Sequence, residues 1–186
     1  MDPQSVIPDD VAEDPDSSGF TLTHQNGLVV DFAIDCEDWQ SVFTAALKDK
    51  CIAILEEVVR HEGYDDITIA VLLTDDDHIA RMNKTHRGKD GATDVLSFPD
   101  DDDDFLGDIA LGYGVIEKQA SEMGITMADH VLHLLVHGTL HLTGHDHIDH
   151  DEAEIMEGIE IKILAHHGLA NPYANPPAHS EAEGVI

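Results

Sequence analysis

Seven of the fourteen histidines in this 186-residue sequence lie between positions 130 and 150. Three of them, His137, His141 and His147, have a spacing that suits a shared metal ion. On a helix, side chains four residues apart project from one face, and Gly144 lets the chain turn so that His147 returns to the same point. Three neutral imidazoles would leave the fourth position of a tetrahedral ion open. Catalytic zinc sites have this number of protein ligands. We therefore predict one Zn²⁺ per chain, bound by these three residues.

The neighbouring histidines admit several roles. His133 lies one helical turn before His137 and is either a fourth ligand or a residue that orients a ligand. For His145 and His150, the sequence leaves open whether they take a direct part in the metal site. The remaining histidines of this part of the chain are expected at the surface: His130, His166, His167 and His179. Their number keeps metal storage as a minor alternative.

The same spacing occurs in zinc proteases with the pattern His-Glu-x-x-His-x-x-Gly-x-x-His, whose glutamate is the general base. This chain has Gly138 at the glutamate position. Amide hydrolysis requires a base and then an acid for the leaving amine, so the glycine argues against a protease. Hydrolysis of a phosphodiester does not require a dedicated general base on the helix, because a metal and cations can stabilise the leaving oxygen.

A second group of reactive residues is cationic. The sequence has 39 acidic residues against nine lysines and arginines, and its net charge is −30. Such a field favours solubility and repels nucleic acid from the body as a whole. Four of the nine basic residues nevertheless fall within nine positions: Arg81, Lys84, Arg87 and Lys89. This local patch inside an acidic body can still hold a phosphate.

Hydrophobic periodicity predicts the elements that must position these residues. Strands are expected at 27–34, 67–73, 93–98 and 106–111. Helices are expected at 38–61, from a cap at Thr74 to 84, at 115–123, at 127–142 and at 149–166. The aspartates at 100–104 are read as a solvated loop between two antiparallel strands. The predicted fold is α+β, a small mixed sheet with flanking helices and the zinc site at the C-terminal end of a central helix.

Composition sets the expected domain organisation. Residues 1–18 are acidic and rich in Ser, Pro and Asp, and are expected to be disordered. One domain is expected over 19–170, followed by a flexible, proline-containing tail at 171–186. The two cysteines form no Cys-x-x-Cys pair. The sequence has no apolar run long enough for a membrane span and no basic start of a secretion signal, so a cytoplasmic location is expected.

Several segments together resemble a known family. Residues 133–147 (HLLVHGTLHLTGHDH) are similar to the signature of the bacterial YbeY family of rRNA maturation factors and single-strand-specific endoribonucleases. Residues 82–89 (MNKTHRGK), 92–99 (ATDVLSFP) and 106–109 (LGDI) follow the same family's order. At position 145 the chain has histidine where tyrosine is frequent in the family.

The resemblance implies a set of functional expectations. His137, His141 and His147 match the family's zinc ligands, and Arg87 matches its functionally important arginine, so His137 and Arg87 are the expected catalytic residues. The implied activity is metal-dependent cleavage of single-stranded RNA in 16S rRNA 3′-end maturation and ribosome quality control. The implied partners are the 16S rRNA precursor and the small ribosomal subunit with its associated proteins.

Two other classes of function compete with this reading. One is a ribosome-assembly factor whose zinc is chiefly structural, and the other is a different zinc hydrolase, including a protease. Gly138 argues against the protease. The sequence leaves open the cleavage site, the end chemistry, a second metal ion and the oligomeric state.

Overall fold

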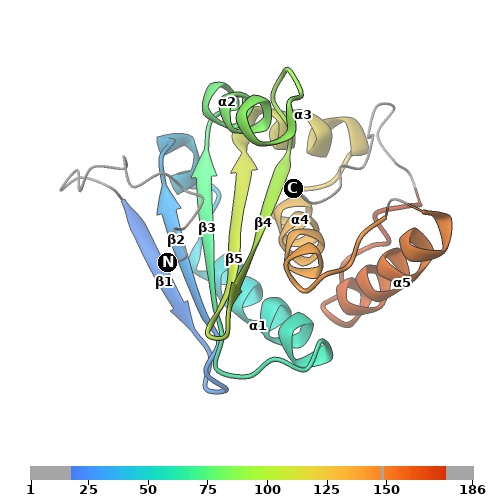
Figure 1. Ribbon diagram of the computed structural model, residues 1–186. Helices are drawn as coiled ribbons and strands as arrows, with labels where there is room; N and C mark the ends of the chain where they lie inside the picture. The colour runs from blue at the N-terminus through green and yellow to red at the C-terminus, as the bar shows by residue number, and fades with distance from the viewer. Residues whose placement is uncertain (1–17, 148, 175–186) are drawn as a thin grey trace.

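A five-stranded β-sheet forms the centre of the molecule (Figure 1). The computed structural model describes residues 18–147 and 149–174. In spatial order the strands are β1 (Gly19–Thr23), β2 (Val29–Ile34), β3 (Thr68–Thr74), β5 (Phe105–Gly112) and β4 (Val95–Asp102). Strands β2, β3 and β5 are parallel, and β1 and β4 add antiparallel edges. The sheet is therefore mixed, as the sequence predicts.

Five α-helices and a short 3₁₀-helix surround the described sheet. They are the 3₁₀-helix η1 (Glu37–Ser41), α1 (Ala45–His61), α2 (Asp76–Arg87), α3 (Tyr113–Met123), α4 (Met127–Leu142) and α5 (His150–His166). Helices α1 and α4 pack beside each other on one side of the sheet, and α5 lies outside them, against both (Figure 1). The predicted α+β class is confirmed.

Alternation along the strands divides the core between the two faces of the sheet. Val71 and Ile109 point to the face covered by α1 and α4, where the larger hydrophobic cluster lies. Leu96 and Ala110 point to the opposite face, where Ile79 and other side chains of α2 cover them. A strand that is buried on both faces reads as a continuous apolar run, which explains the composition of β3 and β5.

Several helices and strands begin or end at other residues than predicted, because side-chain hydrogen bonds cap the helices. The expected helix 38–61 is interrupted, because η1 ends at Ser41 and Thr44 caps α1 by accepting a hydrogen bond from the Leu47 N–H. Helix α2 is capped by Asp75 instead of Thr74, whose hydroxyl donates to the Asp35 carboxylate. Strand β1 was not predicted, since its alternating residues are only half-buried.

The acidic hairpin between β4 and β5 is tighter than the predicted loop at 100–104. Strand β4 continues to Asp102, which pairs with Phe105. The carboxylates of Asp100 and Asp102 accept backbone N–H groups two residues ahead, which is the local bonding typical of aspartate in turns. Residues 101–104 are exposed, as expected, whereas Asp100 is half-buried. The pairing of β4 with β5 extends to Asp102, although the charged run predicted a loop.

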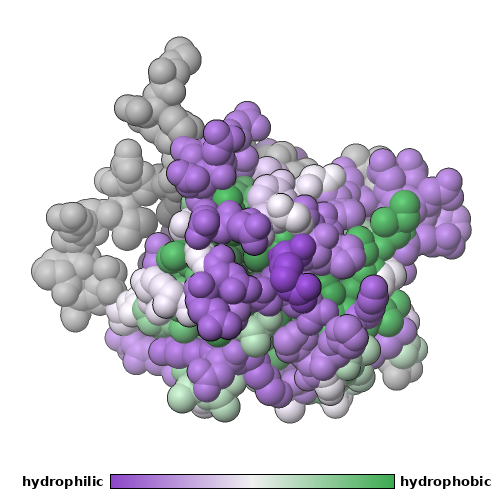
Figure 2. All heavy atoms as spheres, turned by 90° about the horizontal axis from the view of Figure 1, so that it is seen from below, coloured by the Kyte–Doolittle hydropathy of each residue, from purple (hydrophilic) through white to green (hydrophobic). Residues whose placement is uncertain are grey.

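The surface reflects the acidic composition. The view in Figure 2 shows a mostly hydrophilic face with scattered hydrophobic side chains. No helix within 18–147 and 149–174 combines the length and apolarity that a bilayer crossing requires. The segment expected to be disordered lies outside the described residues except for Ser18, and the single domain at 19–170 stays a prediction.

We predict that Gly107→Ala destabilises the sheet. Gly107 has φ of 134°, and an added Cβ would lie 2.1 Å from the carbonyl oxygen of Phe98. Backbone strain of this kind costs about 1–3 kcal/mol in the free energy of unfolding. Urea unfolding measures it. The matched control is Gly158→Ala in α5, where a Cβ meets nothing within 4 Å and helix propensity should raise stability. Equal stability of Gly107→Ala and the native chain would contradict the prediction.

Candidate metal centre

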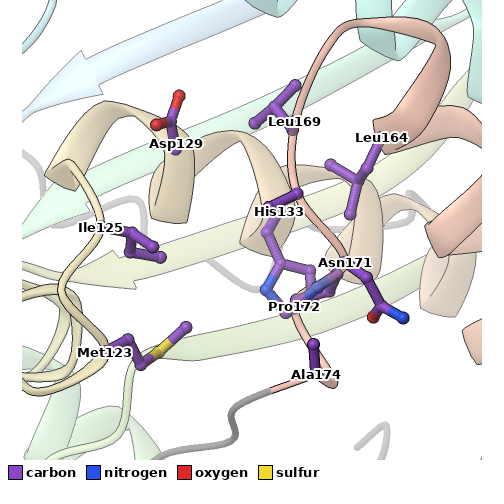
Figure 3. Close-up of a pocket in the computed structure, with 10 residues that line it drawn as sticks. Met123, Ile125, Asp129, His133, Leu164, Leu169, Asn171, Pro172 and Ala174 are labelled. Carbon is purple, nitrogen blue, oxygen red and sulfur yellow. The ribbon is translucent and has the colours of Figure 1, made fainter.

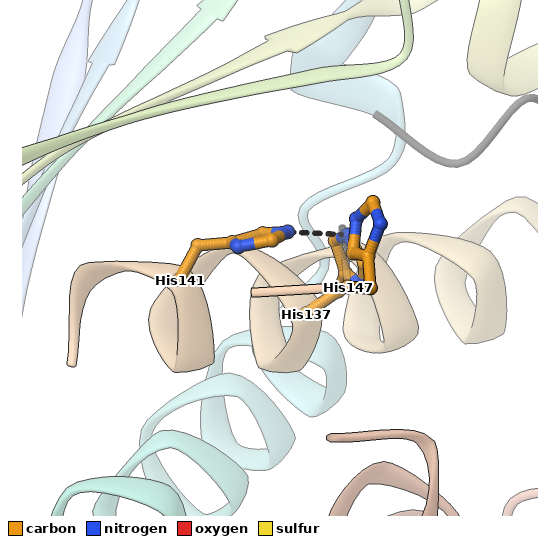
Figure 4. Close-up of side chains that lie close together, drawn as sticks. All are labelled: His137, His141 and His147. Carbon is orange, nitrogen blue, oxygen red and sulfur yellow. Dashed lines mark hydrogen bonds between the residues drawn. The ribbon is translucent and has the colours of Figure 1, made fainter. Parts of the chain in front are cut away.

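Three histidine side chains converge where α4 ends. His137 and His141 lie on α4 and are 8% and 2% exposed, and His147 lies in the segment between α4 and α5. Each ring offers one nitrogen within 4.8 Å of the others. The ring centroids are 4.6 to 5.5 Å apart, and Figure 4 shows the three rings gathered over the helix. The group could hold one metal ion.

The turn after α4 brings His147 back to the helix. Gly144 has φ of 97°, a conformation that glycine adopts without strain. The N–H of His145 then donates to the Leu140 carbonyl, and the N–H of His147 donates to the Asp146 carboxylate. Asp146 thus shapes the backbone beside His147, while Asp149 caps α5.

Hydrogen bonds on the far side of two rings fix their tautomers. Nδ1 of His137 lies 2.8 Å from Oε1 of Glu160, and Nδ1 of His141 lies 2.9 Å from the carbonyl oxygen of His145. A carboxylate and a carbonyl only accept hydrogen bonds, so both Nδ1 atoms carry the proton. In the neutral rings, both Nε2 atoms therefore present lone pairs, and they lie 3.0 Å apart (Figure 4).

This arrangement fits a tetrahedral ion. Nε2 of His147 is buried and has no hydrogen-bond partner among the described residues, which is costly for an imidazole nitrogen. Zinc–nitrogen bonds of about 2.0–2.1 Å place two tetrahedral ligand atoms about 3.4 Å apart, close to the separation of the His137 and His141 nitrogens. A shared cation would give all three nitrogens a partner.

Burial and charge set the protonation of the centre without a metal. Burial, with the nearby His137, lowers the pKa of His141 to about 4. Burial also opposes a charged His137, but the hydrogen bond and negative charge of Glu160 outweigh it and raise the pKa of His137. Burial likewise opposes an ionised Glu160, but its histidine partners lower the pKa of that carboxyl. Without metal, a protonated His137 can thus donate through Nε2 to His141.

Gly138 lets α4 approach the sheet closely. Its carbonyl accepts a hydrogen bond from the Ser97 hydroxyl of β4, at 3.2 Å. A Cβ at this position would lie 3.1 Å from Ser97 Oγ and 3.2 Å from a methyl group of Ile109. Position 138 therefore faces packed strands, so the glutamate of the zinc proteases has no room here.

The other histidines differ in their surroundings. Nε2 of His133 lies 2.9 Å from Oε2 of Glu160, and His133, His137 and Glu160 form a second group whose ligand atoms lie close enough together to hold a metal ion. His145 contacts Glu62, and His150 is 83% exposed in its side chain. The expectation that His130 lies at the surface is wrong, because it is 3% exposed and contacts Gln119. His166 and His167 both contact the Glu57 carboxylate, and His179 lies outside the described residues.

Two residues of the centre were not predicted from the sequence. Glu160 is fully buried on α5 and faces His133 and His137, and Tyr173 donates to it. A signal for Glu160 exists, since it falls on the same helical stripe as the buried Met156 and Leu164. Tyr173 lies beyond the end of α5 and has no comparable signal.

Arg87 is the last residue of α2, and Gly88 ends the helix in the left-handed conformation. The side chain of Arg87 is half-buried. Residues 88–94 then lead into β4, the strand that contacts α4 beside His137. In the basic patch, Lys84 pairs with the exposed Asp90. The role of Arg87 at the metal centre stays a prediction.

Comparison with known proteins decides the family. The family model described as "Endoribonuclease YbeY" matches residues 33–168, which include all three converging histidines. The chain belongs to the YbeY endoribonuclease family. A relative named Endoribonuclease YbeY from Maricaulis maris is 44% identical over 161 residues, covering 82% of this chain and 98% of the relative. One of the same name from Rhodopseudomonas palustris is 38% identical, covering 90% and 92%.

A solution structure of a Thermotoga maritima protein is also similar to this YbeY chain. It is 29% identical and covers 74% of this chain and 91% of that one, with a TM-score of 0.49. The resemblance seen in the sequence motifs is confirmed by the family match.

We predict that Gly138→Glu destabilises the protein and creates no peptidase. Overpacking between helix and sheet costs about 1–3 kcal/mol, and a buried carboxylate adds to that cost. Urea unfolding and a peptide-cleavage assay measure the two effects. Gly158→Glu introduces the same charge at an open, exposed position and should change stability little. Native stability together with peptide cleavage by Gly138→Glu would refute the steric argument.

We predict that His130 makes the metal-free protein less stable in acid. Burial, with the nearby His133, lowers its pKa from 6.5 to about 4. Between these values the unfolded chain binds a proton at this residue that the folded chain does not, so stability falls as the pH falls from about 6.5 to about 4. His130→Gln should weaken this pH dependence, measured by urea unfolding with a chelator. His150→Gln, at an exposed position, is the control and should follow the native curve.

Proposed function

We propose that this chain is a zinc-dependent endoribonuclease that cleaves single-stranded RNA. The observation that carries the proposal is the convergence of three imidazole nitrogens on one point, with two tautomers fixed and the third nitrogen otherwise without a partner. Membership of the YbeY family and relatives named endoribonucleases support the RNA substrate. His137, His141 and His147 would be the metal ligands.

The ligand set supports a catalytic ion over a purely structural one. Structural zinc sites are closed by a fourth protein ligand, whereas three ligands leave a position for water or substrate. Glu160 and His133 are engaged with each other at 2.9 Å, and the carboxylate contacts Nδ1 of His137 rather than the metal-facing Nε2. The chemistry that zinc supplies in such a site is a lowered water pKa, about 7, and polarisation of a phosphoryl oxygen.

The protein's own residues would bind and orient the substrate. Arg87 would hold the scissile phosphate through paired hydrogen bonds and stabilise the charge that builds on its oxygens. Because the net charge of the chain is −30, RNA approach depends on this local cationic patch. His137 would keep its proton on Nδ1 and donate it in a hydrogen bond to Glu160, which leaves the lone pair of Nε2 to bind the ion.

We infer the biological setting from the resemblance of the sequence motifs to the YbeY family. We place the activity in 16S rRNA 3′-end maturation and ribosome quality control in the cytoplasm. The small ribosomal subunit and its associated proteins would present the RNA. A ribosome-assembly factor with structural zinc remains the main rival, and RNA cleavage by purified protein separates the two.

We predict that Arg87→Ala and His137→Ala both abolish most RNA cleavage. Losing one group that stabilises transition-state charge typically costs about 10²–10³-fold in rate, and His137→Ala should also weaken metal binding. The measurement is cleavage of a single-stranded RNA by stringently purified protein, with and without a chelator. Arg60→Ala and His150→Ala, both at exposed positions, should retain native rates.

Cleavage that survives both Arg87→Ala and His137→Ala would assign the activity to a contaminant or another site. Mapping 16S rRNA 3′ ends in cells depleted of the protein tests the proposed setting. Normal 3′ ends in those cells would contradict a role in maturation.

A further inference from the structure

Glu160 is a fully buried carboxylate with three hydrogen-bond donors around it. Oε1 accepts from Nδ1 of His137 at 2.8 Å. Oε2 accepts from Nε2 of His133 at 2.9 Å and from the hydroxyl of Tyr173 at 2.6 Å. The side chain of Glu160 is 0% exposed. Glutamate is almost never buried to this extent without partners, so these contacts account for its presence in the core.

We propose that Glu160 is a positioning residue of the metal centre, acting through His137. The inference rests on the metal site of the proposed function. Histidines that bind metals commonly donate their second ring N–H to a carboxylate, which fixes ring orientation and makes the metal-facing nitrogen more basic. Glu160 meets this geometry from α5, so the last helix supplies the orienting group for a ligand on α4.

The two ligands on α4 are oriented by unlike acceptors. His141 donates to the carbonyl oxygen of His145, which is neutral and lies in the same turn. His137 donates to a carboxylate that lies 23 residues further along the chain. Glu160 thus adds a negative charge behind one ligand, within a buried region where charges interact strongly. Replacing it with glutamine keeps the size of the side chain and removes that charge.

Tyr173 and His133 hold the second oxygen of Glu160. The rings of His133 and Tyr173 meet edge-on, with centroids 5.8 Å apart. Figure 3 shows His133 beside Asn171 and Pro172. The segment after α5, residues 169–174, lines a pocket of about 170 Å³ together with α4. Because Tyr173 belongs to the same segment, the chain after α5 takes part in orienting the metal ligand.

The test is the equilibrium affinity for Zn²⁺, measured on the full chain by competition with a chromophoric chelator. Glu160→Gln should lower the affinity about 10- to 100-fold, the usual cost of removing such an orienting partner. Tyr173→Phe should lower it by a smaller factor, because Glu160 and its charge remain. Visible absorption of the Co²⁺-loaded protein should change in Glu160→Gln, since the spectrum reports the geometry around the ion.

Two variants provide matched controls. Glu57 also holds two histidines, His166 and His167, at 2.8 and 2.9 Å, but touches none of the proposed ligands. Glu57→Gln should leave Zn²⁺ affinity and the Co²⁺ spectrum unchanged. Tyr113, whose hydroxyl donates to Glu117, is the corresponding control for Tyr173→Phe.

The outcomes separate this inference from the proposed function. Native Zn²⁺ affinity and a native Co²⁺ spectrum in Glu160→Gln would overturn the inference and leave the metal centre intact. An equal loss of affinity in Glu57→Gln would also overturn it. Glu57 lies on α1 and contacts the end of α5, so the loss would then come from a weakened attachment of α5 and not from the charge behind His137. Failure of the native chain to bind Zn²⁺ would overturn both proposals. Should Glu160→Gln fail to fold, Tyr173→Phe against Tyr113→Phe decides the question.

Discussion

The burial of several imidazole rings on one helix governs the centre of this protein. Helix α4 is buried along most of its length between the sheet, α1 and α5, yet it carries four histidines. Each ring nitrogen inside such a core requires a partner, because an unpaired polar atom there costs about 1–3 kcal/mol. Glu160, the His145 carbonyl and Gln119 supply partners for some of these atoms. The three converging nitrogens face one another, as a metal site requires, whereas Nδ1 of His130 and of His133 has no partner among the described residues.

The position of α4 depends on the absence of a side chain at Gly138. Close approach to β4 and β5 buries the helix and sets the depth of His137 and His141. A glutamate there would force the helix away from the sheet. The same residue thus accounts for helix packing and for the absence of the protease-type base.

Much of this arrangement could be predicted from the sequence, because it depends on hydrophobic periodicity and on the spacing of residues that are close in the chain. Helix α4 matches its predicted bounds, and the spacing of His137, His141 and His147 indicated their convergence. The interruption before α1 depends on one side-chain cap at Thr44, and β1 depends on pairing with β2, neither of which periodicity reveals. The sequence analysis placed His130 at the surface and did not single out Glu160. The cost of burying these two polar side chains is offset by hydrogen bonds to residues on other helices, which the local sequence does not reveal.

The placement of His147 outside α4 has a mechanical consequence. His137 and His141 are fixed by one rigid helix, whereas His147 belongs to the segment that leads into α5. An ion shared by all three would act as a cross-link between two parts of the backbone, much as a disulfide does. Chelation would then loosen the junction between α4 and α5 first, while the sheet, on the other side of α4, would keep its own packing.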